Sequence, residues 1–397
     1  MNKTITILCN SYPPEKGAGP TRIYNLAHML QSRGYDVEVV TSIPNYPTGK
    51  IFPEYRYKLA KHEVYDGIKV RRLWHLPSNS KFPLKRMVSM ITQSASIYII
   101  ALPHLLRKRP AIIFVSSPPI LLGYTGMIVA KLVGAKSILN ISDIWPHSAL
   151  ELGVIKPGKF YNYLENLEKR MYRFADFCVG QSEEILERIE YVLPGRKKKF
   201  LYRNLQEISP YAEHARPSGK KKIVYAGMLG IAQGMMDICQ QINFTELNVE
   251  LHIYGEGFEK PLLLNFIKTN PNNGVFYHES IQGKEIPLML KDYHATLVPL
   301  ITNIHGAVPS KIFMAISNGL PVLFSGNGEG AKIVKEGKIG WVNSPSDYEG
   351  LKNNILLFGK VSEIEYNSIR ANCIELAQNT FDKRKQDDAF DDFLQNN

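Results

Sequence analysis

The sequence has 397 residues, of which 44% are hydrophobic and 21% are charged. This length suits two or three domains, and the apolar fraction, with a slightly negative mean hydropathy, excludes a disordered chain and a polytopic membrane protein. The four cysteines have no paired spacing and no basic-then-apolar segment opens the chain, so we expect free thiols, no secretory signal and a cytoplasmic protein.

The formal net charge of +11 is unevenly distributed along the chain. Residues 1–205 contain 30 Lys and Arg against 15 Asp and Glu, whereas residues 206–397 contain 18 against 22. A basic half joined to a weakly acidic half predicts that the first half faces an anionic surface, such as that of a membrane. The alternative is an ordinary solvated surface.

Short apolar runs alternate with helix-length segments through the first half of the chain. This alternation predicts a parallel sheet covered on both faces by crossover helices. We expect strands over residues 4–10, 36–41, 111–116, 136–141 and 177–180, and helices over residues 21–33 and 159–174.

Residues 87–106 contain no Asp, Glu, Lys or Arg, and the basic residues Lys81, Lys85, Arg86, Arg107, Lys108 and Arg109 bracket them. The segment is long enough to span a bilayer, but its Ser, Thr, Gln, Pro and His residues favour a helix that lies on the membrane interface. A buried crossover helix of the first sheet is the alternative, and both can hold for different faces.

Residues 205–221 are polar, contain two prolines and lack a periodic apolar face, which is typical of a linker. Apolar runs resume afterwards, and we expect strands over residues 223–226, 250–254, 275–277, 295–299, 321–324 and 340–342. We therefore predict an α/β fold of two doubly wound parallel-sheet domains, 1–205 and 206–379, with a helix over 380–397 packing back across their junction. Ligands of open α/β sheets bind outside the carboxyl ends of the strands, so we expect the chemistry in a cleft between the domains.

Three glycine-bearing loops follow predicted strands. Glycine lets the backbone approach a ligand, and the N-terminus of a following helix offers N–H groups to a phosphate. Each loop alone is more often a plain turn, but three in equivalent places predict a phosphate-bearing ligand. The loops are residues 10–20 (NSYPPEKGAGP, with Gly17 and Gly19), 225–234 (YAGMLGIAQG, with Gly227 and Gly230) and 254–257 (YGEG, with Gly255 and Gly257).

Other chemistries lack their usual motifs. The sequence has no strand-terminal Asp-x-Asp, no H-E-x-x-H, no Walker motif, no G-x-S-x-G and no recognised nucleic-acid-binding module. We therefore expect no metal, no cofactor and no nucleic acid. Helix dipoles, backbone amides and cations such as Lys311 would then stabilise a departing diphosphate.

Further motifs run in order through nearly the whole chain, and together with the glycine loops they make the chain resemble one glycosyltransferase family. It is similar to the family-4 retaining glycosyltransferases of the two-domain GT-B architecture, and within them to the branch that includes the N-acetyl-L-fucosamine transferases of bacterial surface-polysaccharide assembly. The motifs are residues 12–19 (YPPEKGAG) with Arg22, 34–37 (GYDV), 44–50 (PNYPTGK), 116–119 (SSPP), 143–146 (DIWP), 167–176 (LEKRMYRFAD), 227–234 (GMLGIAQG), 308–313 (VPSKIF), 319–322 (GLPV) and 328–330 (GEG).

The resemblance implies a nucleotide-sugar donor, UDP-linked, held by the second domain, and a hydroxyl acceptor held by the first. Asp143 would orient a sugar hydroxyl or help to take the acceptor proton, Lys311 would neutralise phosphate charge, and Glu329 would lie near the donor sugar. Arg22, Asn45 and Tyr46 are expected on the acceptor side. Donor binding is expected from Gly17, Gly19, Gly227, Gly230, Gln233, Gly255, Gly257, Val308, Pro309 and Ser310.

The sequence also departs from the wider family. Gly306 and Met314 replace two glutamates, Met228 and Gln233 replace an Arg and a Lys of the phosphate loop, and Ser142 replaces a His. These changes leave open weaker donor binding or loss of activity. Several of these residues also have a structural alternative: Asp143 and Glu329 as helix caps, Lys311 as a solvated charge, and Gly17, Gly19, Gly227 and Gly257 as turn residues.

The resulting prediction is transfer of an N-acetylated amino or deoxyamino sugar, with retention, to a polyprenyl-diphosphate-linked saccharide at the inner face of the cytoplasmic membrane. It belongs to capsule, O-antigen or exopolysaccharide assembly. Two alternatives remain, a nucleotide-sugar epimerase of the same fold and a catalytically impaired assembly protein.

Overall fold

The computed structural model describes residues 4–46, 48–78, 83–281 and 283–397. Pro47, within the motif at 44–50, and Lys81 lie outside the described residues. The chain divides into two compact units: unit 1 comprises Met1–Arg203 and Asp387–Asn397, and unit 2 comprises Asn204–Gln386. The chain therefore passes from unit 1 to unit 2 and returns at its end.

The described part of unit 1 contains an eight-stranded sheet in the order β3-β4-β2-β1-β5-β6-β7-β8. Neighbouring strands are parallel, except that the edge strand β3 runs antiparallel to β4. The five predicted strands are confirmed, and β3, β4 and β8 are additional. The strands are β1 (Thr4–Leu8), β2 (Asp36–Ser42), β3 (Ala60–Tyr65), β4 (Ile68–Leu73), β5 (Ile112–Ser117), β6 (Lys136–Ile141), β7 (Phe177–Gly180) and β8 (Lys198–Leu201).

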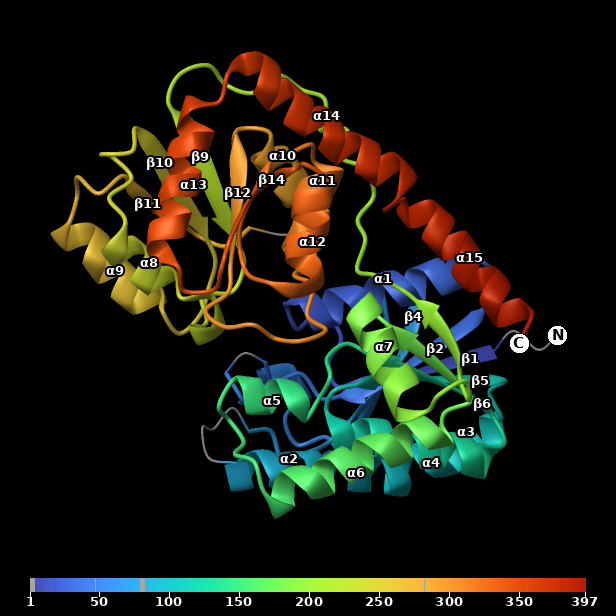
Figure 1. Ribbon diagram of the computed structural model, residues 1–397. Coiled ribbons are helices and arrows are strands. Elements are labelled where there is room, and N and C mark those ends of the chain that lie inside the picture. The colour runs from blue at the N-terminus through green and yellow to red at the C-terminus, as the bar shows by residue number, and fades with distance from the viewer. Residues whose placement is uncertain (1–3, 47, 79–82, 282) are drawn as a thin grey trace. The chain divides into compact units, whose positions relative to one another are not determined.

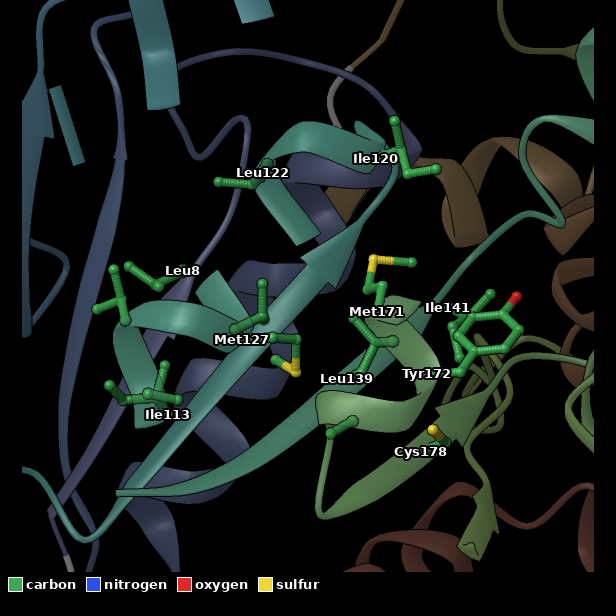
Figure 2. Close-up of a cluster of buried hydrophobic side chains, with 14 of the residues drawn as sticks. Leu8, Ile113, Ile120, Leu122, Met127, Leu139, Ile141, Met171, Tyr172 and Cys178 are labelled. Atoms are coloured by element: carbon green, nitrogen blue, oxygen red, sulfur yellow. The ribbon is translucent and has the colours of Figure 1, made fainter. Parts of the chain in front are cut away.

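Helices cover both faces of this sheet because its central strands carry apolar residues on both sides. In β5, Ile113 and Val115 join a cluster on one face, and Ile112 and Phe114 join a second cluster on the other. Figure 2 shows the first cluster, in which Leu8 and Ile113 of the strands lie near Met127 of a covering helix.

The first cluster involves the π-helical turn η2 (Ile97–Ala101), α3 (Leu102–Lys108), α4 (Ile120–Val133), α6 (Lys159–Phe174) and α7 (Glu183–Val192). The helix α2 (Pro83–Ser96) packs on α4. The second involves α1 (Ala18–Ser32) and α15 (Lys383–Gln395). Two short helices, η1 (Pro53–Tyr55) and α5 (His147–Glu151), complete unit 1. The predicted helix over 159–174 is confirmed, whereas α1 begins three residues before the predicted Thr21.

The C-terminal helix α15 completes the core of unit 1. Phe390 is fully buried, with its ring centroid 4.7 Å from that of Tyr202. The Tyr202 hydroxyl donates a 2.8 Å hydrogen bond to Asp387, and the Tyr35 hydroxyl donates one of the same length to Asp391. The last residues of the chain are thus held by both apolar and polar contacts.

Within the described residues of unit 2, six parallel strands form a sheet in the order β11-β10-β9-β12-β13-β14. All six predicted strands of the second half are confirmed. They are β9 (Lys221–Ala226), β10 (Val249–Tyr254), β11 (Val275–His278), β12 (Ala295–Pro299), β13 (Val322–Ser325) and β14 (Gly340–Asn343).

Two apolar clusters again lie on opposite faces of this sheet. The first involves α8 (Met235–Gln241), α9 (Lys260–Thr269) and α13 (Tyr348–Lys360), and the second involves α10 (Ile286–Leu290), α11 (Ser310–Ser317), α12 (Gly328–Glu336) and α14 (Glu363–Asn379). The turns η3 (Ile231–Gln233) and η4 (Gly283–Glu285) lie between these elements. Figure 1 shows the labelled elements of both units.

The uncharged segment at 87–106 lies in the continuous helix formed by α2, η2 and α3. Leu84–Lys108 is long and apolar enough to cross a membrane by length and composition, since it contains an 18-residue window with a mean hydropathy of 1.3. Its inner face, however, contributes Ile97, Ala101 and Leu105 to the first cluster of unit 1. The segment is therefore a crossover helix of the first sheet, which confirms that alternative, and its position on a membrane interface stays a prediction.

Candidate functional site

The glycine loop after β1 and the loop after β2 are joined by Glu15. Its carboxylate is buried and accepts 2.9 Å hydrogen bonds from the backbone N–H groups of both Asn45 and Tyr46. Burial raises the pKa of the Glu15 carboxyl, while these hydrogen bonds lower it. Gly17 has φ 132° and precedes the first residue of α1, and a Cβ atom there would lie 3.9 Å from the Tyr46 ring. The structure thus brings Gly17, Asn45 and Tyr46 together through a residue that the sequence did not single out.

Arg22 lies in α1 and reaches the carboxyl ends of two other strands. Its guanidinium donates 2.8 Å hydrogen bonds to the Ser142 hydroxyl after β6 and to the Gln181 side-chain oxygen after β7. Both partners are neutral, and burial lowers the pKa of Arg22 to about 10. A desolvated cation without a carboxylate partner among the described residues is an anion-binding candidate. Gly19 is also in α1, where a Cβ atom would meet Ser11 at 3.8 Å.

Asp143 follows β6 at the same edge of the sheet. Burial raises the pKa of its carboxyl, while hydrogen bonds from the Ser148 side chain and the Ile144 backbone N–H lower it. The contact with the Ser148 side chain gives Asp143 a structural role, but the predicted helix-cap alternative is wrong for α5, whose N-cap residue is Pro146 without a side-chain cap. Its other oxygen, Oδ1, is buried and has no hydrogen-bond partner among the described residues. One oxygen of the carboxylate is therefore used by the fold, and the other has no partner among the described residues.

In unit 2, Lys311 lies against the glycine loop that follows β9. A Cβ atom on Gly227 would be 2.6 Å from Lys311 Nζ, so a larger residue there would displace the end of the lysine side chain. The Lys311 ammonium lies 4.8 Å from the ring centroid of Tyr225, and desolvation lowers its pKa to about 8. Among the described residues no carboxylate forms an ion pair with it. Lys311 is partly exposed but packs on Gly227 and Tyr225, so it is not a fully solvated surface charge.

The N-terminus of α11 presents Lys311 together with unsatisfied backbone groups. Pro309 occupies the N-cap position without a side-chain cap, and the first turn contains no acidic residue. Val308, Pro309 and Ser310 are all partly exposed here. Because the first N–H groups of a helix lack intrahelical partners, this end of α11 suits an anion.

The other predicted glycines of unit 2 hold two loops together. The N–H of Gly227 donates to the Tyr254 carbonyl and that of Leu229 to the Glu256 carbonyl, both at 2.9 Å. A Cβ atom on Gly255 or Gly257 would collide with the backbone of the first loop. These two glycines therefore have a packing role, whatever their role toward a donor.

Gln233 and Gly230 belong to the same loop. The helix that follows this loop, α8, has a carboxylate at its N-terminus. The Gln233 side-chain oxygen lies beside Gly230, and Gln233 lines a small pocket with Gly234, Ile301 and Ser325. The buried carboxylate of Glu259 accepts a 3.1 Å hydrogen bond from the Met235 N–H at the start of α8. The N-terminus of α8 is therefore occupied by a carboxylate, unlike that of α11.

Glu329 lies in the first turn of α12 and is 7% exposed. A Cβ atom on the adjacent Gly330 would be 3.2 Å from Ile312, the residue after Lys311. The beginnings of α11 and α12 are thus neighbours.

Gly306 and Met314, which replace the two family glutamates, have structural roles. Gly306 has φ 84°, a conformation that favours glycine, and the Met314 carbonyl accepts hydrogen bonds from Ser317 and Asn318 at the end of α11. No described group of three or more His, Cys, Asp or Glu side chains could hold a metal ion.

Three known proteins are similar to this chain in sequence or in fold. Probable glycosyltransferase WbjE of Pseudomonas aeruginosa is 23% identical over 312 residues, which cover 74% of this chain and 76% of WbjE. The solved structure of Alr3699/HepE from Anabaena in complex with UDP covers all of both chains with a TM-score of 0.70 and 13% identity. WaaG, a glycosyltransferase involved in lipopolysaccharide biosynthesis, covers 98% of this chain and 99% of its own with a TM-score of 0.64 and 14% identity.

Two family models match the two halves of the chain. The glycosyl transferase 4-like domain matches residues 17–199, and glycosyl transferases group 1 matches residues 211–379. The first match contains Arg22 and Asp143, and the second contains Gly227, Lys311 and Glu329. The two parallel α/β sheets agree with the folds of the structural neighbours. The chain belongs to the glycosyltransferases of the GT-B, family-4 type.

Proposed function

We propose that this enzyme transfers a sugar from a UDP-linked donor, held by unit 2, to a lipid-linked saccharide held by unit 1. Lys311 carries the proposal, because it packs against Gly227 and Tyr225, has no carboxylate partner among the described residues, and needs a ligand to supply the opposite charge. The donor diphosphate would meet Lys311 and the uncapped start of α11. HepE, whose structure was solved with UDP, supports a uridine nucleotide.

The proposed reaction retains the anomeric configuration. The bond between the anomeric carbon and the donor phosphate oxygen breaks, and the acceptor oxygen bonds to that carbon on the same face. The acceptor proton passes to the departing phosphate oxygen, whose charge Lys311 and the α11 amides stabilise. Asp143 would orient the acceptor or a donor hydroxyl through its unpartnered Oδ1, and Glu329 would contact the donor sugar.

The proposed acceptor is a polyprenyl-diphosphate-linked saccharide at the inner face of the cytoplasmic membrane, in surface-polysaccharide assembly. The basic first half of the chain supports an anionic acceptor and surface. Arg22, held by Ser142 and Gln181, is the cation of unit 1 that we expect nearest to the acceptor phosphates. WaaG, which takes part in lipopolysaccharide biosynthesis, supports this class of acceptor.

Product analysis tests the reaction directly. The purified enzyme is first screened by thermal shift against UDP-, GDP- and dTDP-sugars, since a bound nucleotide raises the melting temperature. The best donor is then incubated with a short-chain polyprenyl-diphosphate saccharide, and the anomeric configuration of the product is read by NMR. We expect stabilisation by a UDP-sugar and a retained product.

The other outcomes separate the alternatives. An inverted product excludes same-face attack. Interconversion of the UDP-sugar without acceptor identifies an epimerase. Donor binding without turnover on any acceptor identifies a binding protein, as the replacement of two family glutamates by Gly306 and Met314 would allow.

A further inference from the structure

The edge strand β3 leaves one side of the first sheet open. It pairs with β4 on its inner side, and none of the described strands pairs with its outer side. Leu59, just before the strand, and Val64 within it are each 71% exposed. The strand also contains neither a proline nor a bulge, which are devices that protect an edge from pairing with another chain. The outer side of β3 is therefore open to a further strand.

The backbone of β3 directs alternate residues outward. Where β3 begins, the Trp74 N–H donates a 2.9 Å hydrogen bond to the Leu59 carbonyl. In an antiparallel pair, successive residues direct their N–H and C=O groups to opposite sides of the strand. Every second residue from Leu59 onward therefore faces β4, and the residues between them face outward. The outward residues are Ala60, His62 and Val64.

The charges of β3 complement those of a second copy of the same strand. A twofold axis through His62 relates two antiparallel copies and places Lys61 of each copy opposite Glu63 of the other. Within one chain these two side chains already form an ion pair. The four side chains of two copies thus form a square of alternating charge. Moving the axis by one residue would place Lys61 opposite Lys61, or Glu63 opposite Glu63, and both arrangements are unfavourable.

The same alignment matches the backbone groups and the exposed apolar residues. His62 lies opposite His62 and Ala60 opposite Val64, so the outward N–H and C=O groups of both copies form a continuous ladder. Leu59 comes opposite Tyr65. Both of the apolar residues that are exposed at this edge are thus covered by the second copy.

The two outer edges of the sheet differ in their charges. The strand β8 at the other edge begins with Lys198 and Lys199, and lysines of this kind protect an edge from pairing. Near the axis through His62, in contrast, the nearby cation is balanced. Arg71 donates a 2.7 Å hydrogen bond to the His62 ring and forms an ion pair with Glu38. The edge at β3 is therefore the one that suits a second copy.

We propose that this chain forms a twofold dimer in which β3 pairs antiparallel with β3 of a second copy, centred on His62. The sheet of unit 1 then continues from one copy into the other. A pair of six-residue strands is a small interface, so we expect a reversible dimer that dissociates on dilution. The dimer goes beyond the proposed sugar transfer and does not depend on it.

A single introduced cysteine at the axis tests the alignment. In His62→Cys the two thiols of a dimer belong to residues directly opposite each other, with Cα atoms about 5.5 Å apart, which is within the range of a disulfide. The four native cysteines are buried and should not react. Under mild oxidation we expect a disulfide-linked dimer on a non-reducing gel.

Val64→Cys is the matched control, because Val64 lies on the same face of the same strand. In the proposed alignment the two copies of residue 64 are four residues apart along the strands, or about 13 Å, and should form little cross-linked dimer. Equal cross-linking of both variants, or stronger cross-linking of Val64→Cys, would contradict the alignment.

Sedimentation velocity at increasing protein concentration measures the dimer without a cross-link. The unchanged protein should shift towards twice the mass of one chain. Lys61→Glu places like charges opposite each other at two symmetric positions and should raise the dissociation constant at least about tenfold. Lys268→Glu makes the same charge change at an exposed position of α9 in unit 2 and should behave like the unchanged protein.

Melting temperatures equal to that of the unchanged protein establish that the variants are folded. An unchanged protein that stays monomeric at every concentration would refute the dimer. A dimer that Lys61→Glu and Lys268→Glu weaken equally would use another surface, and the proposal would then be wrong.

Discussion

The surroundings of Lys311 do not stabilise the positive charge of its ammonium group. In the unliganded protein its pKa of about 8 lies below the ordinary 10.5, because burial disfavours the ammonium. Between these two pH values the unfolded chain binds more protons than the folded one, so this group makes the folded state more stable as pH rises through that window. A bound diphosphate should reverse the balance by favouring the ammonium.

The affinity for UDP should therefore fall as pH rises above about 8, by up to about tenfold per unit. Calorimetric titration with UDP from about pH 7 to about pH 10 measures this dependence. Lys311→Met should bind UDP roughly tenfold to a hundredfold more weakly at neutral pH, since hydrogen bonds to charged groups contribute about 1.5–3 kcal/mol. Its affinity should also lose the pH dependence, and an equally steep profile in Lys311→Met would contradict this role.

The sequence singled out some candidate site residues but not their structural partners. Lys311, Gly227 and Asp143 follow from motif and position, since each lies at a strand end or helix start. Glu15 was missed because its role comes from contacts with backbone N–H groups of residues 45 and 46, thirty residues away. The pairing of Arg22 with Gln181 is equally non-local. An acidic residue within a Gly/Pro loop was the only local signal for Glu15.

Among the elements, α15 should contribute to the stability of unit 1 and not to that of unit 2. Phe390→Ala removes a fully buried ring, and such truncations destabilise by about 3–5 kcal/mol. Hydrogen exchange should quicken in β5, β7 and β8 and stay unchanged in unit 2. Gln395→Ala, on the exposed side of α15, should have no such effect, and a uniform increase in both units would contradict the assignment of this helix to unit 1.

The buried strands were predicted correctly because continuous apolar runs specify them. The strand β3 escaped because its sequence, AKHEVY, places only partly exposed or exposed side chains at the edge of the sheet. Asp66 and Gly67 between β3 and β4 formed a hairpin signal that could have revealed both strands. The sequence placed the start of α1 too late because Gly19 and Pro20, in its first turn, have weak helix propensity.

For the whole molecule, the assignment of the donor to unit 2 predicts which loops a bound nucleotide protects from hydrogen exchange. We expect UDP to slow hydrogen exchange in the loop after β9 and at the start of α11, and to leave the loops after β1 and β6 unchanged. A lipid-free acceptor saccharide diphosphate should show the opposite pattern. Protection by UDP confined to unit 1 would contradict the assignment of the donor to unit 2.

Because Asp387–Asn397 belong to unit 1, the ribosome releases the segment that completes the first unit only after the whole of unit 2 has been synthesised. Until then the nascent chain exposes the apolar surface that Phe390 and Leu394 later cover. Unit 2 can finish folding first, against the usual order of domains during translation. A premature stop codon just before residue 387 would therefore damage the part of the protein that was made first.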